Sequence, residues 1–174
     1  MKLSLKAATI SALSALVIAP ILSAGQAAAQ PTGTNASYIG GGIAAGVTNG
    51  GQTGDAATFG GNIQGRYAIP NTPVSARGAI LFSDETSAIM PIVSYDVPVF
   101  NNTNVYVGGG YSFVEQNGRP TPLGNRNSFV LTTGVETQVA RDIVLYSDAK
   151  LGIRAYENSP ASAVSFQAGA AYRF

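Results

Sequence analysis

Two carboxylates, Glu136 and Asp148, are the residues of this chain best suited to acid–base chemistry. Paired carboxylates can act as general acid and base, but arginine and lysine candidates nearby make ion pairing the simpler interpretation. The sequence has no histidine and no cysteine, which excludes Ser–His and Cys–His nucleophile pairs, histidine metal sites and thiolate sites. We therefore predict no enzyme, no catalytic residue, no metal site and no cofactor.

These two carboxylates belong to a larger set of charged residues. Each of them occupies the same one of the two alternating faces of its expected strand. The set consists of Arg66, Arg77, Asp96, Glu136, Asp148, Lys150, Arg154 and Arg173. Successive side chains of a strand point to opposite faces, so the set faces one side of the sheet. Because an unpaired buried charge is strongly unfavourable, we predict a paired network around Glu136 and Asp148.

The elements that carry these residues are eight windows of strand length with period-two alternation. The windows are 37–47, 57–69, 74–83, 87–97, 104–115, 128–140, 143–156 and 163–174. In the last window, Val164, Phe166, Ala168, Ala170, Tyr172 and Phe174 fall on one face. Neighbouring windows are too close in sequence for helical crossovers, so they should pair as an antiparallel meander. Pro91 falls outward in the middle of its window and predicts a bulge.

The connections alternate between two kinds. Residues 70–73, 98–103 and 141–142 are short or compact, whereas the other set is 49–55, 84–86, 116–127 and 158–161. Barrels of the outer membrane have short periplasmic turns and longer outer loops.

Under this arrangement, the outward-facing aromatic residues fall into two groups, one near each end of the barrel. We expect Phe59, Phe82, Tyr111, Phe113 and Phe129 near the outer end, and Tyr67, Tyr95, Tyr172 and Phe174 near the periplasmic end. Two girdles of this kind are typical of a membrane-spanning barrel.

The N-terminal residues predict export. Lys2 and Lys6 provide a basic region, residues 7–21 form an apolar stretch interrupted only by threonine and serine, and residues 27–29 are alanines suited to cleavage. We therefore assign residues 1–29 to a cleaved signal peptide and 30–174 to one outer-membrane β-barrel. The chain after residue 29 carries a net charge of −1, so it has no excess of positive charge with which to bind nucleic acid.

The combined pattern is all-β: an eight-stranded antiparallel up-and-down transmembrane barrel. It resembles the small outer-membrane barrels, the class of the OmpA membrane domain, OmpX and the opacity proteins. The resemblance implies that the C-terminal strand, with Phe166, Tyr172 and Phe174, is the signal read by the barrel assembly machinery. The chain ends at Phe174, so a following peptidoglycan-binding domain and its wall anchoring are not expected. Lipid-remodelling barrel enzymes use a catalytic histidine, which this sequence lacks.

Three functions stay open at this point. The first is a structural or surface-interaction barrel in the bacterial outer membrane that displays residues 116–127. The second is a narrow porin-like channel, because many inward positions are glycine or alanine; the third is an outer-membrane enzyme. The expected partners are outer-membrane lipid and the assembly machinery, and closure of the barrel predicts a monomer because no strand edge remains free.

Overall fold

The computed structural model describes residues 32–51 and 58–174. The predicted signal peptide, residues 1–29, lies outside the described residues. The division of the chain at residue 30 therefore stays a prediction. Among the residues that are described, no helix has the length and apolarity required to cross a bilayer.

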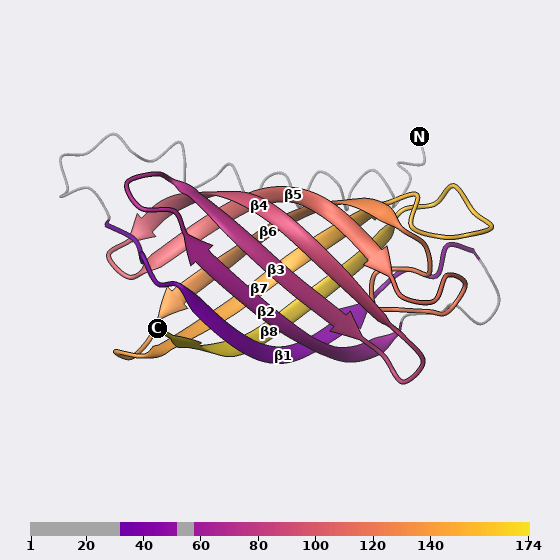
Figure 1. Ribbon diagram of the computed structural model, residues 1–174, viewed down its shortest axis with the longest axis horizontal. Helices are drawn as coiled ribbons and strands as arrows, with labels where there is room; N and C mark the ends of the chain where they lie inside the picture. The colour runs from indigo at the N-terminus through magenta and orange to yellow at the C-terminus, as the bar shows by residue number, and fades with distance from the viewer. Residues whose placement is uncertain (1–31, 52–57) are drawn as a thin grey trace, which may run out of the picture. The chain divides into compact units, whose positions relative to one another are not determined.

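Eight β-strands follow one another along the described chain (Figure 1). Their bounds are β1 Tyr38–Gly46, β2 Phe59–Ala68, β3 Val74–Phe82, β4 Ser87–Phe100, β5 Thr103–Val114, β6 Ser128–Gln138, β7 Ile143–Ile153 and β8 Ala163–Arg173. Each strand lies within or close to one predicted window.

The sheet closes on itself, because β1 pairs antiparallel with both β2 and β8. At the β1–β8 seam, Gly41 lies opposite Ala170. Every other strand pairs with its neighbours in the sequence, also antiparallel. The predicted eight-stranded up-and-down barrel is confirmed.

The two largest differences from the predicted strand boundaries are of three residues each. β4 runs on to Phe100, so only two residues separate it from β5. β7 stops at Ile153 instead of residue 156, because Arg154 has a φ of 54°. A strand needs a negative φ, so the chain leaves the sheet at Arg154.

The bulge predicted at Pro91 is wrong. Ile89 lies opposite Phe113 and Ile92 lies opposite Gly110, so the register of β4 against β5 is the same on both sides of Pro91. The register instead shifts between Pro98 and Phe100. Proline removes one donor from the ladder, whereas a bulge requires an extra residue, and none is inserted at Pro91.

The two faces of the barrel invert the pattern of a soluble protein. The outer face exposes large apolar side chains from every strand, such as Phe59, Val93 and Leu131. The inner face buries charged and polar side chains, such as Arg66 and Lys150, together with two apolar clusters. An apolar outside and a polar inside suit a barrel surrounded by lipid.

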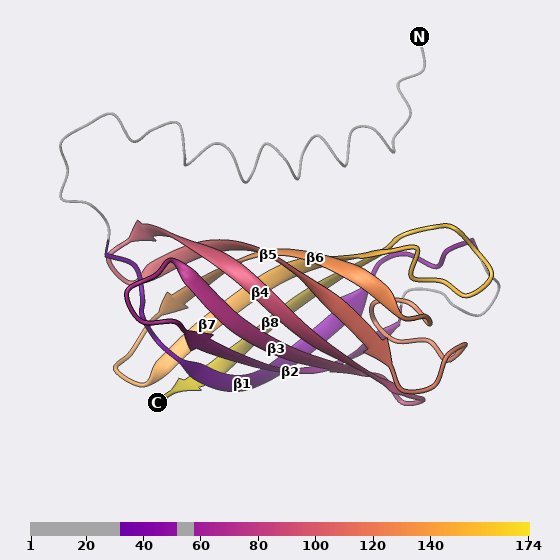
Figure 2. The ribbon, with the colours of Figure 1, turned by 45° about the horizontal axis from the view of Figure 1, so that its top comes forward.

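The two ends of the barrel differ, as Figures 1 and 2 show. The short connections between β2 and β3, β4 and β5, and β6 and β7 lie at the end where β8 finishes; we call this the turn end. The longer connections between β5 and β6 and between β7 and β8 lie at the opposite end, which we call the loop end.

Candidate functional site

Four charged side chains from four strands form a closed ring inside the barrel, which we call the ion-pair quartet. Arg66 contacts Asp96 at 2.7 Å and Glu136 at 3.0 Å. Arg77 contacts the same two carboxylates, each at 3.0 Å. Each guanidinium therefore bridges both carboxylates, and the four charges cancel within the buried interior.

The strand register explains why these four side chains meet. Arg66 on β2 lies directly opposite Arg77 on β3, a pairing of like charges that is unfavourable by itself. Asp96 on β4 and Glu136 on β6 reach into the same layer of the lumen and neutralise the two arginines. Asp96 comes from the strand next to β3, whereas Glu136 comes from β6, which pairs with neither β2 nor β3. The arginine pair therefore gains its second carboxylate only because the barrel closes.

Two serines complete the arginine–aspartate side of the quartet. The Arg66 Nε–H donates to Ser75 at 2.9 Å, and the Arg77 Nε–H donates to Ser94 at 2.7 Å. Both serine hydroxyls donate in turn to Asp96, Ser94 at 2.9 Å. Asp96 is thus held by two guanidiniums and two hydroxyls, which offsets its desolvation.

The Glu136 carboxylate also accepts hydrogen bonds from neutral donors, in addition to its contacts with the two arginines. The Tyr38 hydroxyl donates to Oε2 at 2.9 Å, and the Asn104 amide donates to Oε1 at 3.1 Å. Tyr38 also accepts a hydrogen bond from Arg77 at 3.0 Å. The glutamate side chain is fully buried, and it has no free oxygen available for acid–base chemistry.

A second ion pair, between Lys150 and Asp148, lies deeper in the lumen. Lys150 Nζ is 2.6 Å from Asp148 Oδ1 and donates to Gln167 at 2.7 Å and to Gln64 at 3.4 Å. The Tyr106 hydroxyl donates to the other oxygen of Asp148 at 2.9 Å. Lys150 and Asp148 are next-nearest neighbours on β7, so the alternation of the strand places both inside.

Tyrosine rings join the two charged groups. The Arg77 guanidinium carbon lies 3.6 Å from the centroid of the Tyr106 ring, whose hydroxyl binds Asp148. Tyr38 and Tyr146 stack with their centroids 6.3 Å apart and their planes 7° from parallel. Glu136 and Asp148 therefore belong to one continuous network, but each carboxylate has its own cations.

These inward tyrosines were not predicted, although the alternation along each strand identifies them. Tyr106 lies between Asn104 and Gly108 in the alternation, so it must point inward with them. Glycines provide the space for the rings. A Cβ added at Gly134 would lie 2.7 Å from the Tyr106 ring, and one added at Gly169 would lie 2.6 Å from the Tyr146 ring.

Two of the eight charged residues singled out from the sequence lie outside this network. Arg173 donates to Gln138 at 2.9 Å near the turn end. Arg154 is exposed beyond the end of β7, where its positive φ turns the chain away from the strand. Its parity was counted as if β7 continued, and this is why the prediction placed it in the lumen.

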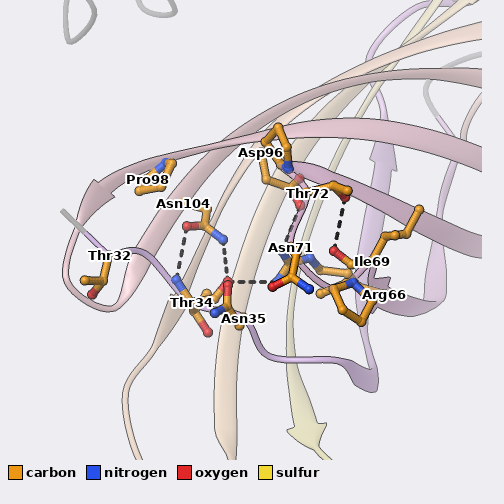
Figure 3. A pocket seen from close by; sticks show the side chains of 13 residues that line it. Thr32, Thr34, Asn35, Arg66, Ile69, Asn71, Thr72, Asp96, Pro98 and Asn104 are labelled. Atoms are coloured by element: carbon orange, nitrogen blue, oxygen red, sulfur yellow. Dashed lines mark hydrogen bonds and ion pairs between the residues drawn. The ribbon is translucent and has the colours of Figure 1, made fainter. Parts of the chain in front are cut away.

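The turn end of the lumen is covered by residues 32–37, which we call the N-terminal segment. Thr34 accepts hydrogen bonds from Arg66 at 3.2 Å and from Asn104 at 2.8 Å, and its own N–H donates to Asn104 at 3.1 Å (Figure 3). Arg66 also donates to the Ala36 carbonyl at 2.9 Å. The quartet thus anchors the N-terminal segment across the opening.

An open cavity of about 560 Å³ remains beside this segment. Figure 3 shows its polar lining, with Thr34, Asn71 and Asn104 among the labelled side chains. Arg66 and Asp96 form its inner wall, but both are engaged in the quartet. The cavity therefore ends at the quartet.

The loop end is covered by the connection between β5 and β6. Its residues 121–125, which we call the inner loop segment, are all buried. Pro122 reaches β1 on the far side of the mouth, where its carbonyl oxygen would lie 2.6 Å from a Cβ added at Gly46. Leu123 is 1% exposed and packs into an apolar cluster with side chains from strands around the barrel.

This arrangement corrects the expectation that residues 116–127 are displayed as a whole. The middle of the loop folds into the mouth because an apolar layer of the lumen, including Leu81, Met90 and Val130, accepts Leu123. Thr121 closes a tight turn with Gly124, donating from its hydroxyl to the Gly124 carbonyl at 2.7 Å. The residues on either side of this segment, including Asn117, Arg119 and Arg126, remain exposed.

The outward aromatic residues lie near the two ends of the barrel. Tyr111, Phe113 and Phe129 form a cluster at the loop end, with ring centroids 4.9 and 5.1 Å apart. Phe59 and Phe82 are exposed at the same end, and Tyr67, Tyr95, Tyr172 and Phe174 are exposed at the turn end. Phe100, which was not predicted to belong to this group, joins them at 68% exposure because β4 is longer than predicted.

The charged side chains inside the lumen form ion pairs with one another. Residues 32–51 and 58–174 contain no cluster of three or more histidine, cysteine, aspartate or glutamate residues that could hold a metal ion. The carboxylates of Asp96, Glu136 and Asp148 are each held by a cation.

Comparison with known proteins supports the interpretation of the fold. The family model described as outer membrane protein beta-barrel domain matches residues 14–174. Among curated protein sequences, none matches this chain.

Several solved structures share the fold at low sequence identity. The Yersinia pestis attachment invasion locus protein Ail is 16% identical, with a TM-score of 0.52 over 80% of this chain and 99% of Ail. The N-terminal β-barrel domain of Pseudomonas aeruginosa OprF is 11% identical, with a TM-score of 0.54 over 81% of this chain and 98% of that domain. Neisserial surface protein A is 15% identical, with a TM-score of 0.51 over 79% of this chain and 97% of that protein.

Proposed function

The chain belongs to the family of outer membrane protein β-barrel domains, and we propose that it is a sealed, non-conducting barrel with a structural role in the bacterial outer membrane. The observation that carries this proposal is that the chain's own residues occupy the lumen at both ends. The inner loop segment covers the loop end, and the quartet with the N-terminal segment covers the turn end.

The apolar layer around Leu123 is the first barrier to ions. Leu81, Met90, Val130 and Ala155 surround it, and all are at most 1% exposed. An ion that crosses this layer loses its hydration without gaining a ligand, which is strongly unfavourable.

The quartet is the second barrier. An eight-stranded barrel encloses just enough space for its own side chains, and here four buried charges bind one another across that space. Opening a path requires breaking buried ion pairs, and an uncompensated buried charge costs about 3–5 kcal/mol. A narrow porin-like channel is therefore the weaker alternative.

We further propose that the turn end faces the periplasm and the loop end faces outward. Short turns at the periplasmic side are the rule for such barrels. The exposed aromatic residues at the two ends would then lie at the two membrane interfaces, where amphipathic rings are favoured. Residues 1–29 would be the export signal, and β8, with Phe166, Tyr172 and Phe174, would be read by the assembly machinery.

A surface-interaction role is retained only for the exposed part of the loop end. The structural neighbour Ail is named as an attachment invasion locus protein. In this chain the exposed residues around Asn117 and Arg119 would carry any such contact. We propose no enzymatic role, because the lumen carboxylates are engaged by cations.

Single-channel recording of the refolded protein in planar bilayers tests the sealed barrel. We expect no discrete conductance steps over a wide range of voltage and salt. A gel shift between unboiled and boiled samples verifies that the barrel is folded. Reproducible steps in the wild type would overturn the proposal.

The charge-neutral double variant R77A/E136A tests which layer seals the lumen. It removes one guanidinium and one carboxylate together, so the net charge of the quartet stays at zero. Conductance in this variant would assign the seal to the quartet. Absence of conductance would assign the seal to the apolar layer around Leu123.

A further inference from the structure

We propose that the loop end carries a binding site for a lipid headgroup phosphate, formed by Arg126 and Arg154. The two arginines line one recess of about 350 Å³ together with Glu157, Asn158, Ser159 and Pro160. Arg126 comes from the connection that leads into β6, and Arg154 follows the last residue of β7.

The two guanidiniums lack partners that the chain provides to its other loop-end arginine. Arg119 pairs with Glu85 at 2.8 Å. Neither Arg126 nor Arg154 makes an ion pair or a side-chain hydrogen bond with any residue in 32–51 or 58–174. Both side chains are exposed, so both have their full set of donors available for a ligand.

The backbone beneath the recess is well ordered by hydrogen bonds. The Arg126 N–H donates to the Ala155 carbonyl at 3.1 Å, which ties the two arginine-bearing segments together. Buried Asn125 donates from its N–H to the same carbonyl at 3.0 Å and accepts from the Glu157 N–H at 2.9 Å. The backbones that carry the two arginines are therefore held together before any ligand binds, so only their side chains must be ordered on binding, which lowers the entropic cost.

Arg154 has an unusual backbone conformation for its residue type. Its φ of 54° lies in the left-handed region, which non-glycine residues seldom adopt. This conformation ends β7 at the rim and lets Ala155 and Tyr156 turn inward, where both are buried, while the Arg154 side chain is exposed. Backbone strain of this kind is concentrated at functional sites.

The height of the recess indicates which phosphate it meets. Ile153, the residue before Arg154, lies opposite Phe129, and both side chains are exposed on the outer face of the barrel. Arg126 is close in sequence to Phe129 and precedes β6. The guanidiniums therefore lie just beyond the apolar belt, at the level of lipid headgroups.

The chemistry of the two side chains favours phosphate. A guanidinium presents donors in a planar fork that matches two phosphate oxygens. Two such forks against the single Glu157 carboxylate leave a net charge of +1 in the recess. The Glu157 carboxylate lies beside Gly118, since a Cβ added there would be 2.8 Å from Oε2. This carboxylate should weaken anion binding without abolishing it.

The site rests on the proposed orientation, which places the loop end in the leaflet that carries phosphorylated glycolipid. A binding assay in detergent micelles separates the two proposals, because lipid in a micelle reaches both ends of the barrel. Failure to bind there counts against the site alone, whereas conductance of the wild type counts against the sealed barrel alone.

The test measures binding of bis-phosphorylated lipid A to the refolded protein by native mass spectrometry and by titration in micelles. We expect R126A/R154A to bind at least about tenfold more weakly, since the loss of a single hydrogen bond to a charged group is worth about a factor of ten. E157Q should bind more tightly. The matched control is R141A, which removes an exposed arginine from the turn end.

Three results would overturn the site. One is equal binding of lipid A by the wild type and R126A/R154A, and another is an equal loss in R141A. The third is equal binding of lipid A from which the phosphates have been removed.

If R126A/R154A does not give a folded barrel on gels, the variant R126K/R154K replaces it. This variant retains the charge but loses the planar forks, so it should still bind lipid A measurably more weakly than the wild type. Inorganic phosphate that binds as tightly as lipid A would overturn the lipid as the ligand.

Discussion

Arg77 lies over the face of the Tyr106 ring, with its guanidinium carbon 3.6 Å from the ring centroid. The same ring donates its hydroxyl to Asp148. One tyrosine thus contacts a cation of the quartet through its π face and an anion of the Lys150 pair through its edge. The cation–π contact is strengthened by its dry surroundings, and the two charged groups are linked by a residue without charge.

The Tyr106→Phe variant tests this link. It retains the ring beneath Arg77 but removes the donor from a buried carboxylate. We expect the free energy of unfolding in lipid vesicles to fall by about 1.5–3 kcal/mol, the range for hydrogen bonds to charged groups. Urea titration followed by the gel shift of the folded barrel measures it. No change in stability would show that Asp148 does not depend on Tyr106.

The Glu136→Gln variant tests the balance of the quartet. It leaves two buried guanidiniums with one carboxylate, so we expect a loss of about 3–5 kcal/mol. The matched control is Glu85→Gln, which breaks the exposed pair with Arg119 and should cost less than about 1 kcal/mol. Equal effects of the two substitutions on the urea midpoint would contradict the buried role of Glu136.

The Gly134→Ala variant tests whether the tyrosines fill the lumen. An added Cβ would lie 2.6 Å from the Asp148 Cβ and 2.7 Å from the Tyr106 ring. We expect destabilisation of about 1–3 kcal/mol, as for other overpacked interiors. Gly78→Ala is the control, since a Cβ at Gly78 meets nothing within 4 Å. If both variants unfold at the same urea concentration, the lumen is looser than the structure shows.

The Leu123→Ala variant tests the inner loop segment. Leu123 is 1% exposed within an apolar cluster, so truncation should cost about 2–5 kcal/mol and increase hydrogen exchange of residues 121–125. The control is Asn117→Ala, an exposed position of the same loop, which should change neither quantity. Unaltered exchange in the Leu123 variant would argue that the segment is held by its backbone bonds alone.

The strands and their faces could be predicted because the signal is local. Alternation along β8 from Val164 to Phe174 depends only on the geometry of a single strand. The same rule placed Arg66 and Lys150 inside and Phe59 and Tyr172 outside. It failed at Arg154, where a single positive φ ends the strand. It also could not decide that Pro91 keeps the register, because register depends on the partner strand.

The amino-acid sequence by itself determined that this chain forms an eight-stranded barrel with an apolar outside and a charged inside. Only the tertiary structure decided that Glu136 meets Arg66 and Arg77 while Asp148 meets Lys150, because the stagger of the closed barrel sets which side chains share a layer. It also decided that Leu123 turns inward, since that contact depends on an apolar layer contributed by distant strands. The alternation along a strand determines which face of the sheet a side chain occupies, whereas its interaction partners depend on closure of the barrel.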